Sequence, residues 1–543
     1  MSVSERNQSD TAVVERTEAE PTEVRPRASA GPGSDLSTAP KVARNASYNF
    51  LSHIWLTGLA IFCTPYIVHR LGDGAYGLLS MVMVVTGYFA MLDLGLAQAV
   101  LKYASEYYGR QDYGRLSRLI GTATTIYVGV GLVGAAVIAL LTGVIVMRVL
   151  NIETELRSVA YFAFYAAALG FLVSMPLSVF NAIPASLQRM DVTNARNALI
   201  GTGTVLGSVI LLKMGFWLRE ILLLNIALNA LGVIAFVAVS RRLLPAVSFV
   251  PRFDRQEARR LFRFGLPTAA SSAGARLMLQ FDRVILGMFW PMAYVTYYVI
   301  PMEMCSKGMI LVRHVTGALF PAVSDRSGNG DMDAVRRMYF RATRVLASGV
   351  IPIFVFLGVF SHPVLTAWMG ERIANQSAVV LSIAAAAFAF QFAAALQNTF
   401  LLAMGHASLM AKWNIIPGLA NLALNLVLIP RYGVVGAAAA MLLVSLGSAI
   451  PYTYVVSRRV LEVSPATLVG YYAAPAVLSA ICVLPAIFVR GSLTSLPLVA
   501  AAFAATGLLY LVIGTGIGVV PKDDLVLAWT VLRGRRKPAS PTT

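Results

Sequence analysis

The chain has 543 residues, of which 57% are hydrophobic and 13% charged, and its mean hydropathy is +0.70. Soluble proteins average about 25% charged residues, so this composition excludes an ordinary soluble protein and indicates a polytopic membrane protein. The formal charge of +18 does not by itself indicate nucleic-acid binding, because basic residues of membrane proteins gather in the loops of one side. We expect no nucleic-acid partner.

The chain begins with a segment unlike the rest. Residues 1–44 are rich in Glu, Ser, Thr, Pro and Ala and have no apolar periodicity, which predicts a disordered tail. The first apolar run begins near Asn45 and is too long for the hydrophobic part of a signal peptide. We therefore expect the first span to act as its own insertion signal.

Fourteen apolar segments are long enough to cross a bilayer, which takes about 20 residues of α-helix. The predicted fold class is thus an all-α polytopic membrane protein. The spans are 45–68, 78–100, 118–147, 158–183, 192–212, 220–240, 261–288, 292–320, 342–361, 378–403, 410–429, 434–456, 467–489 and 495–519.

Loop charge predicts the orientation. With the N-terminus inside, the inner loops and tails hold 28 basic residues and the outer loops eight. The positive-inside rule then places both termini in the cytoplasm of a multi-pass protein of the cell's inner membrane. The longest outer loop, around 362–377, is too short to fold into a catalytic domain outside the membrane.

The two halves of the chain resemble each other. Gly109, Asp112 and Arg118 recur as Gly328, Asp331 and Arg337, an offset of 219, and 213–215 recurs as 431–433, an offset of 218. This pattern predicts two six-span repeats with the transport pathway near their interface. The alternative is that the matches are a coincidence. We predict an N-lobe at 45–250, a C-lobe at 251–465, two accessory spans at 466–520 and a cytoplasmic tail at 521–543.

Motifs of enzyme chemistry are weak or missing. The sequence GDGAYG at 72–77 fits the dinucleotide fingerprint, but it joins two apolar helices instead of a strand and a helix, so we interpret it as a tight turn. No P-loop motif occurs, and Cys63, Cys305 and Cys482 have no metal-ligand spacing. We expect no catalytic residues, no metal and no cofactor.

Basic residues inside the seventh span are the strongest functional signal. A Lys or Arg at bilayer depth costs roughly 2.5–3.5 kcal/mol, which favours a role in a polar interior. Arg276, Gln280 and Arg283 share one helix face over about 10 Å, and guanidinium groups bind phosphate oxygens in a bidentate manner. The alternative is structural ion pairing between helices. Asp282 lies off this face, where we expect it to pair with a neighbouring cation.

The eighth span carries a second charged group. Glu303 and Lys307 are one turn apart and either neutralise each other or act separately, while Arg313 has no acidic partner in its own helix. His314 falls on the face of Glu303. We predict that Lys307 and Arg313 bind substrate and that Glu303 is an ion-coupling candidate.

The first two spans add polar candidates. Asn49 and His53 lie along one side of the first span and are predicted substrate contacts, although a lone His is more often a packing residue. Asp93, in the second span, is an ion-coupling candidate or a partner of Lys102.

Four stretches together carry a family resemblance: RLGDGAYGL at 70–78, LDLGL at 92–96, DRVILG at 282–287 and LNLVLIPRYGVVGA at 424–437. The chain resembles the polysaccharide exporters (O-antigen flippases of the Wzx type) in the superfamily that includes the MATE drug exporters. That resemblance implies two six-helix lobes around a central cavity, plus two C-terminal helices. It also implies movement of polyprenyl-diphosphate-linked oligosaccharide across the bilayer by alternating access, with polysaccharide polymerase or export machinery as a further partner.

Three alternatives stay open at this point. A cation-coupled multidrug exporter of the same fold would need an acidic pocket, and the first lobe offers Asp93 for it. A lipid II flippase is a variant of the main interpretation. A glycan polymerase or acyltransferase would be an enzyme, which the short outer loops disfavour.

Overall fold

The computed structural model describes residues 39–89, 93, 95–278 and 281–520, and these residues form helices and connecting turns without strands. This confirms the predicted all-α fold class. The chain divides after Phe50, and the contacts described below all lie in the unit that begins at Leu51.

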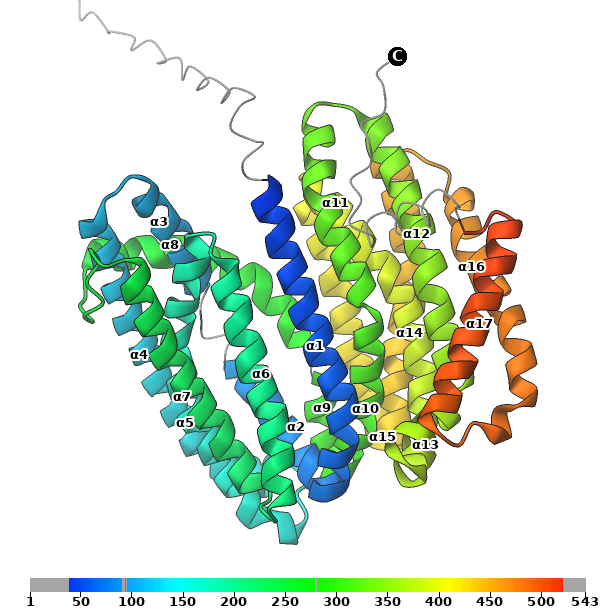
Figure 1. The fold of residues 1–543 in the computed structure, drawn as a ribbon, viewed down its shortest axis with the longest axis horizontal. Helices are drawn as coiled ribbons and strands as arrows, with labels where there is room; N and C mark the ends of the chain where they lie inside the picture. The colour runs from blue at the N-terminus through cyan, green and yellow to red at the C-terminus, as the bar shows by residue number, and fades with distance from the viewer. Residues whose placement is uncertain (1–38, 90–92, 94, 279–280, 521–543) are drawn as a thin grey trace, which may run out of the picture. The chain divides into compact units, whose positions relative to one another are not determined.

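The helices of the first half follow one another with short connections (Figure 1). They are α1 (Ala39–Leu71), α2 (Asp73–Phe89), α3 (Leu96–Gly109), α4 (Tyr113–Val144) with η3 (Ile145–Val149), η4 (Thr154–Leu156), α5 (Arg157–Ser186), α6 (Met190–Lys213) and α7 (Leu218–Leu243).

The second half continues the pattern to the last described helix (Figure 1). Its elements are α8 (Arg255–Met278), α9 (Phe281–Phe289), α10 (Met292–Gly308), α11 (Ile310–Gly328), α12 (Met332–Val359), α13 (Ser361–Met369), α14 (Glu371–Ala403), α15 (Ala407–Val455) with η5 (Val456–Val460), α16 (Pro465–Phe488), η6 (Arg490–Ser492) and α17 (Leu496–Gly516).

Ten helices of the described chain are long and apolar enough to cross a membrane. They coincide with eleven of the fourteen predicted spans, because α15 runs through the predicted spans 410–429 and 434–456. Its interior contains Gly433 with φ +56° and ψ −132°, so the helix changes direction where the loop was expected. A multi-pass membrane protein is confirmed, whereas the count of fourteen is not.

Two of the other three predicted spans are divided between shorter helices: span 78–100 falls on α2 and α3, and span 292–320 on α10 and α11. Span 261–288 falls on α8 and α9, and residues 279–280 between them lie outside the described part of the chain. The α3 boundary has Gly95 at φ +68°, and Met309 breaks the α10–α11 run with a turn. Discontinuous spans commonly lie beside the binding site of a transporter, because their ends expose backbone groups.

The predicted repeat appears in local geometry. Both α3 and α11 end at the repeated glycine, and both following helices begin four residues later, at Tyr113 and Met332. In each turn the repeated aspartate caps the next helix: Asp112 accepts the amide of Arg115 and Asp331 that of Ala334, both at 2.9 Å. Side-chain acceptors at this position stabilise a helix start.

The connection between the halves is bonded to α4. The amide of Arg252 donates to the Gly121 carbonyl at 3.3 Å, and the amide of Asp254 donates to the Thr122 hydroxyl at 3.0 Å. The first turn of α8 is then tied to α3, because the buried carboxylate of Glu257 accepts the phenol of Tyr107 at 3.1 Å. Burial and the Glu257 charge raise the pKa of Tyr107, which keeps this phenol a donor.

Candidate functional site

An open cavity of about 570 Å³ lies among α9, α10, α14 and α15. The break between α10 and α11 contributes Met309 to its wall, and α9 contributes Asp282 and Arg283. The rest of the wall is largely apolar or carries neutral amides and hydroxyls. The volume falls in the range typical of small-molecule sites, roughly 300–1,000 Å³.

Glu303 stands between two of the predicted cations. Its carboxylate lies 3.5 Å from the Arg283 guanidinium and 3.5 Å from the Lys307 ammonium. The Arg283 side chain is 20% exposed and that of Glu303 46% exposed, so the group is accessible from one side. Both contacts are long for a charge-assisted hydrogen bond, which is usually 2.7–2.9 Å. Among the described residues the two cations share this one carboxylate, so each keeps hydrogen-bond donors that no described side chain uses.

Asp282 does not pair with a cation as the sequence suggested. Its carboxylate accepts the phenol of Tyr298 and, at 2.8 Å, the backbone amide of Arg283. No ion pair of Asp282 is present within the described part of the chain. The reason is geometric: the turn after α9 folds α10 back, which brings the buried Tyr298 against Asp282 across 16 residues of sequence.

Other polar residues lie near this group. The charges of Glu303 and Arg283 both act on the Tyr76 phenol of α2. The charges of Arg313, Lys307 and His314 act on the His53 imidazole of α1. The side chains of His53 and Arg313 are both exposed. Because α10 ends at Gly308, His314 lies on a separate helix, α11, and the face that it was expected to share with Glu303 is interrupted.

Asp93 lies apart from this group. Its carboxylate accepts the phenol of Tyr127, a fully buried residue of α4. The Lys102 ammonium lies over aromatic rings, 4.3 Å from the Phe264 centroid and 5.1 Å from the Tyr103 centroid. Ring faces attract cations electrostatically.

Three predicted site residues are not placed by the structure. Gln280 lies outside the described residues. Arg276 and Asn49 fall in helical segments of α8 and α1 whose side chains are not among those described. Their roles stay predictions.

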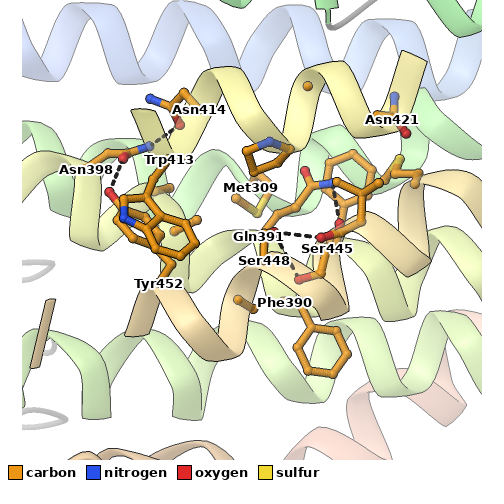
Figure 2. Close-up of a pocket in the computed structure, with 18 of the residues that line it drawn as sticks. Met309, Phe390, Gln391, Asn398, Trp413, Asn414, Asn421, Ser445, Ser448 and Tyr452 are labelled. Atoms are coloured by element: carbon orange, nitrogen blue, oxygen red, sulfur yellow. Dashed lines mark hydrogen bonds between the residues drawn. The ribbon is translucent and has the colours of Figure 1, made fainter. Parts of the chain in front are cut away.

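Sequence reasoning missed the polar wall of the cavity, whose members come from α14 and α15 (Figure 2). The Asn398 amide donates to the Asn414 side-chain oxygen at 3.2 Å and accepts the Tyr452 phenol at 2.5 Å. The Gln391 amide donates to the Ser445 hydroxyl at 3.2 Å. A spacing of seven residues between Gln391 and Asn398, both inside an apolar run, was the available signal, because such residues share a helix face.

A second polar group was also missed, and we name it the clasp: Asp73, Thr296, Tyr297 and Arg372. The Asp73 carboxylate accepts Tyr297 and Arg372, each at 2.8 Å, and its carbonyl accepts the Thr296 hydroxyl at 2.6 Å. The tight turn predicted at 72–77 is confined to Gly72, which has φ +84°, because residues 73–77 already belong to α2. The clasp therefore holds this turn against α10 and α14.

Apolar helices long enough to span a membrane, the two spans interrupted at Gly95 and Met309, and a charged group beside a cavity together define a membrane transporter. The chain belongs to the polysaccharide biosynthesis protein family, whose model matches residues 42–326, more than half of the sequence.

Two curated relatives are similar over most of their length. "Putative O-antigen transporter" from Shigella flexneri is 21% identical over 73% of this chain and 93% of its own. "Probable low-salt glycan biosynthesis flippase Agl15" from Haloferax volcanii is 24% identical over 74% of this chain and 80% of its own.

Solved structures show the same fold. Lipid II flippase MurJ in an inward closed conformation has a TM-score of 0.69 and 11% identity, with 89% of this chain and 100% of that chain covered. An inward-facing multidrug resistance MATE transporter has a TM-score of 0.58 and 14% identity, with 73% and 92% covered. The MATE-like fold inferred from the sequence is thus confirmed.

Proposed function

We propose that the chain translocates polyprenyl-diphosphate-linked oligosaccharide across the cell's inner membrane for surface polysaccharide biosynthesis. The observation that carries the proposal is the largely buried Arg283 guanidinium in the wall of the open α9–α10–α14–α15 cavity. A guanidinium binds phosphate oxygens in a bidentate manner, and Lys307 adds a second cation 3.5 Å from the shared carboxylate. The names of the two curated relatives agree with such a cargo.

Glu303 neutralises part of the positive charge of this site when no cargo is bound. In the unloaded protein its carboxylate compensates Arg283 and Lys307, and an arriving diphosphate replaces it as their partner. The displaced carboxylate is then available to take a proton or a cation, which is the coupling role predicted for Glu303. Asp93 is the second coupling candidate.

The proposed mechanism is alternating access between an N-lobe at 45–250 and a C-lobe at 251–465, with both termini cytoplasmic and no catalytic step. The clasp supports a state in which the side predicted to be outer is closed. Outward movement of an anionic cargo is favoured by an inside-negative potential, worth about 2.3 kcal/mol per charge per 100 mV. The lipid tail stays in the bilayer, and a polysaccharide polymerase or export complex receives the cargo.

The test uses the full-length protein in proteoliposomes loaded with undecaprenyl-diphosphate-N-acetylglucosamine. A galactosyltransferase added outside labels the sugar that reaches the outer leaflet. Arg283→Ala should slow labelling about tenfold or more, because a charge-assisted hydrogen bond contributes about 1.5–3 kcal/mol. Arg263→Ala, an exposed arginine of α8, is the matched control and should leave the rate unchanged.

Two outcomes would reject the proposal. Equal labelling by the wild type and protein-free vesicles removes the flippase activity itself. Ethidium transport by the wild type that survives Arg283→Ala, together with no lipid labelling, favours the drug exporter. The same vesicles with lipid II in place of the donor lipid test the cell-wall alternative: faster flipping of lipid II than of the donor lipid would favour a lipid II flippase.

A further inference from the structure

We propose that the amide-lined part of the α9–α10–α14–α15 cavity is a sugar-binding subsite, which takes one or two neutral pyranose rings of the cargo. This inference rests on the proposed function for its biological meaning. The structural support comes from the residues that line the cavity.

The first observation is the chemistry of the wall. Its neutral polar side chains are four carboxamides and several hydroxyls, placed on facing helices: Gln391 and Asn398 on α14, and Asn414, Asn421, Ser445, Ser448 and Tyr452 on α15. A carboxamide offers two N–H donors and two acceptor lone pairs. Adjacent sugar hydroxyls each donate and accept, so paired amides match them, whereas a phosphate would need donors alone.

The second observation is that the wall keeps unused hydrogen-bonding groups. Within the described chain, the amide nitrogen of Asn414 donates to no partner, and Asn421 Oδ1 is buried without one. Asn398 uses one of its two N–H groups on Asn414. Buried polar groups are normally paired in folded proteins, so leaving them open costs stability unless a ligand uses them.

The third observation is an aromatic platform beside the amides. The indole ring of Trp413 stacks on Tyr452 with centroids 5.1 Å apart and an interplanar angle of 20°. Figure 2 shows this pair next to Asn398 and Asn414, with Gln391, Ser445 and Ser448 forming a second group. A pyranose ring has one face of C–H groups and a rim of hydroxyls, which suits an aromatic surface edged by amides.

The charged side of the cavity fixes the direction of the cargo. Arg283 lines the same cavity as the amides, while Asp282 is already occupied by the Tyr298 phenol. The diphosphate on Arg283 therefore places the first sugars toward Gln391 and Asn398. The cavity volume of about 570 Å³ leaves room for a small number of rings, so recognition is confined to the lipid-proximal sugars.

The experiment measures sugar binding without lipid or diphosphate. Full-length protein in nanodiscs is titrated with the methyl glycosides of glucose, galactose, mannose, rhamnose and N-acetylglucosamine, and saturation-transfer NMR reports contact. We expect at least one glycoside to bind in the millimolar range and hexane-1,2-diol not to bind. Trp413→Leu and Asn398→Leu should each weaken that binding at least fivefold.

Matched variants separate recognition from folding. Trp413→Phe keeps an aromatic surface and should retain binding, whereas Trp55→Leu removes an exposed indole on α1 and should have no effect. The proposal is overturned if no glycoside in the panel binds, or if Trp413→Leu and Asn398→Leu bind as well as the wild type. Glycoside binding without lipid flipping would reject the proposed function and keep the subsite, and flipping without glycoside binding would do the reverse.

Discussion

Asp73 and Arg372 form a 2.8 Å ion pair that joins the first turn of α2 to the first turn of α14, 299 residues apart. The carboxylate is buried at 7% exposure while the guanidinium is 63% exposed, so the pair is open to solvent on one side only. Tyr297 of α10 donates to the same carboxylate at 2.8 Å. Three helices thus depend on one acidic side chain at the side predicted to be outer.

Asp73→Asn should loosen this closure. The amide cannot accept as strongly from both Tyr297 and Arg372, and loss of a hydrogen bond to a charged group costs about 1.5–3 kcal/mol, less here because Arg372 is exposed. We expect the outward-open population to rise at least about fivefold. An impermeant maleimide reports it by labelling a cysteine introduced at Val299, a buried α10 residue outside the clasp, in a chain whose three native cysteines are replaced by Ala. Asp333→Asn, which breaks an exposed pair with Arg336, should not change labelling.

Glu303→Gln tests whether this carboxylate competes with the cargo. Removing the charge frees Arg283 and Lys307, each 3.5 Å away, for an incoming anion. We expect inorganic pyrophosphate to bind about tenfold more tightly, which corresponds to about 1.4 kcal/mol. Calorimetry on the nanodisc-embedded protein measures it.

The control for this effect is Glu462→Gln, because Glu462 pairs with Arg336 away from the cavity. Weaker pyrophosphate binding in Glu303→Gln would show that the carboxylate organises the two cations instead of competing for them. In that case the displacement step proposed for Glu303 is wrong.

A pair of glycines tests the packing of α2 on α10. A Cβ on Gly77 would lie 1.9 Å from the Met292 carbonyl oxygen and 2.8 Å from its carbon, so backbone must move. Overpacking of this kind typically costs 1–3 kcal/mol. Gly77→Ala should therefore lower the Tm by several degrees, whereas Gly58→Ala has open space and should raise it slightly or leave it unchanged. Equal effects would mean that α2 and α10 do not pack this closely.

Hydropathy was sufficient to predict the fold class, because it depends on composition along one helix at a time. Hydropathy did not predict the helix breaks at Gly95 and Met309, because apolar residues continue through them and keep the average hydropathy high. The hydrogen-bond partner of Asp282 was not predicted either. Tyr298 reaches it only after the chain turns at Trp290 and Pro291, and periodicity within a single helix carries no information about that turn.

The cavity wall shows the same limit. Gln391 and Asn398 were visible as amides seven residues apart, but their partners Ser445, Asn414 and Tyr452 lie on another helix. An amide within an apolar helix is equally compatible with helix packing. Only the position of these amides in the wall of the cavity distinguishes a binding role from helix packing.

The hydrogen bond between Tyr107 and Glu257 should make the thermal stability of the protein depend on pH. Burial and the Glu257 carboxylate raise the pKa of Tyr107 above its ordinary value of about 10, so the folded protein holds this proton more tightly than the unfolded chain. Its contribution to stability is therefore complete below pH 10 and declines as the pH rises further. The Tm of Tyr107→Phe should lie below that of the wild type at pH 7, because the buried carboxylate loses a donor.

That difference in Tm should shrink as the pH rises above 10, because the unfolded wild-type chain then loses a proton that the folded protein still holds and that the variant lacks. Tyr108→Phe serves as the matched control, because its neighbouring phenol is exposed and should give a constant difference over the same range. A Tyr107→Phe difference that is constant or grows with pH would contradict the bond to Glu257. The α8 start would then be held on α3 by packing of Tyr103 against Phe264, whose rings lie 6.1 Å apart.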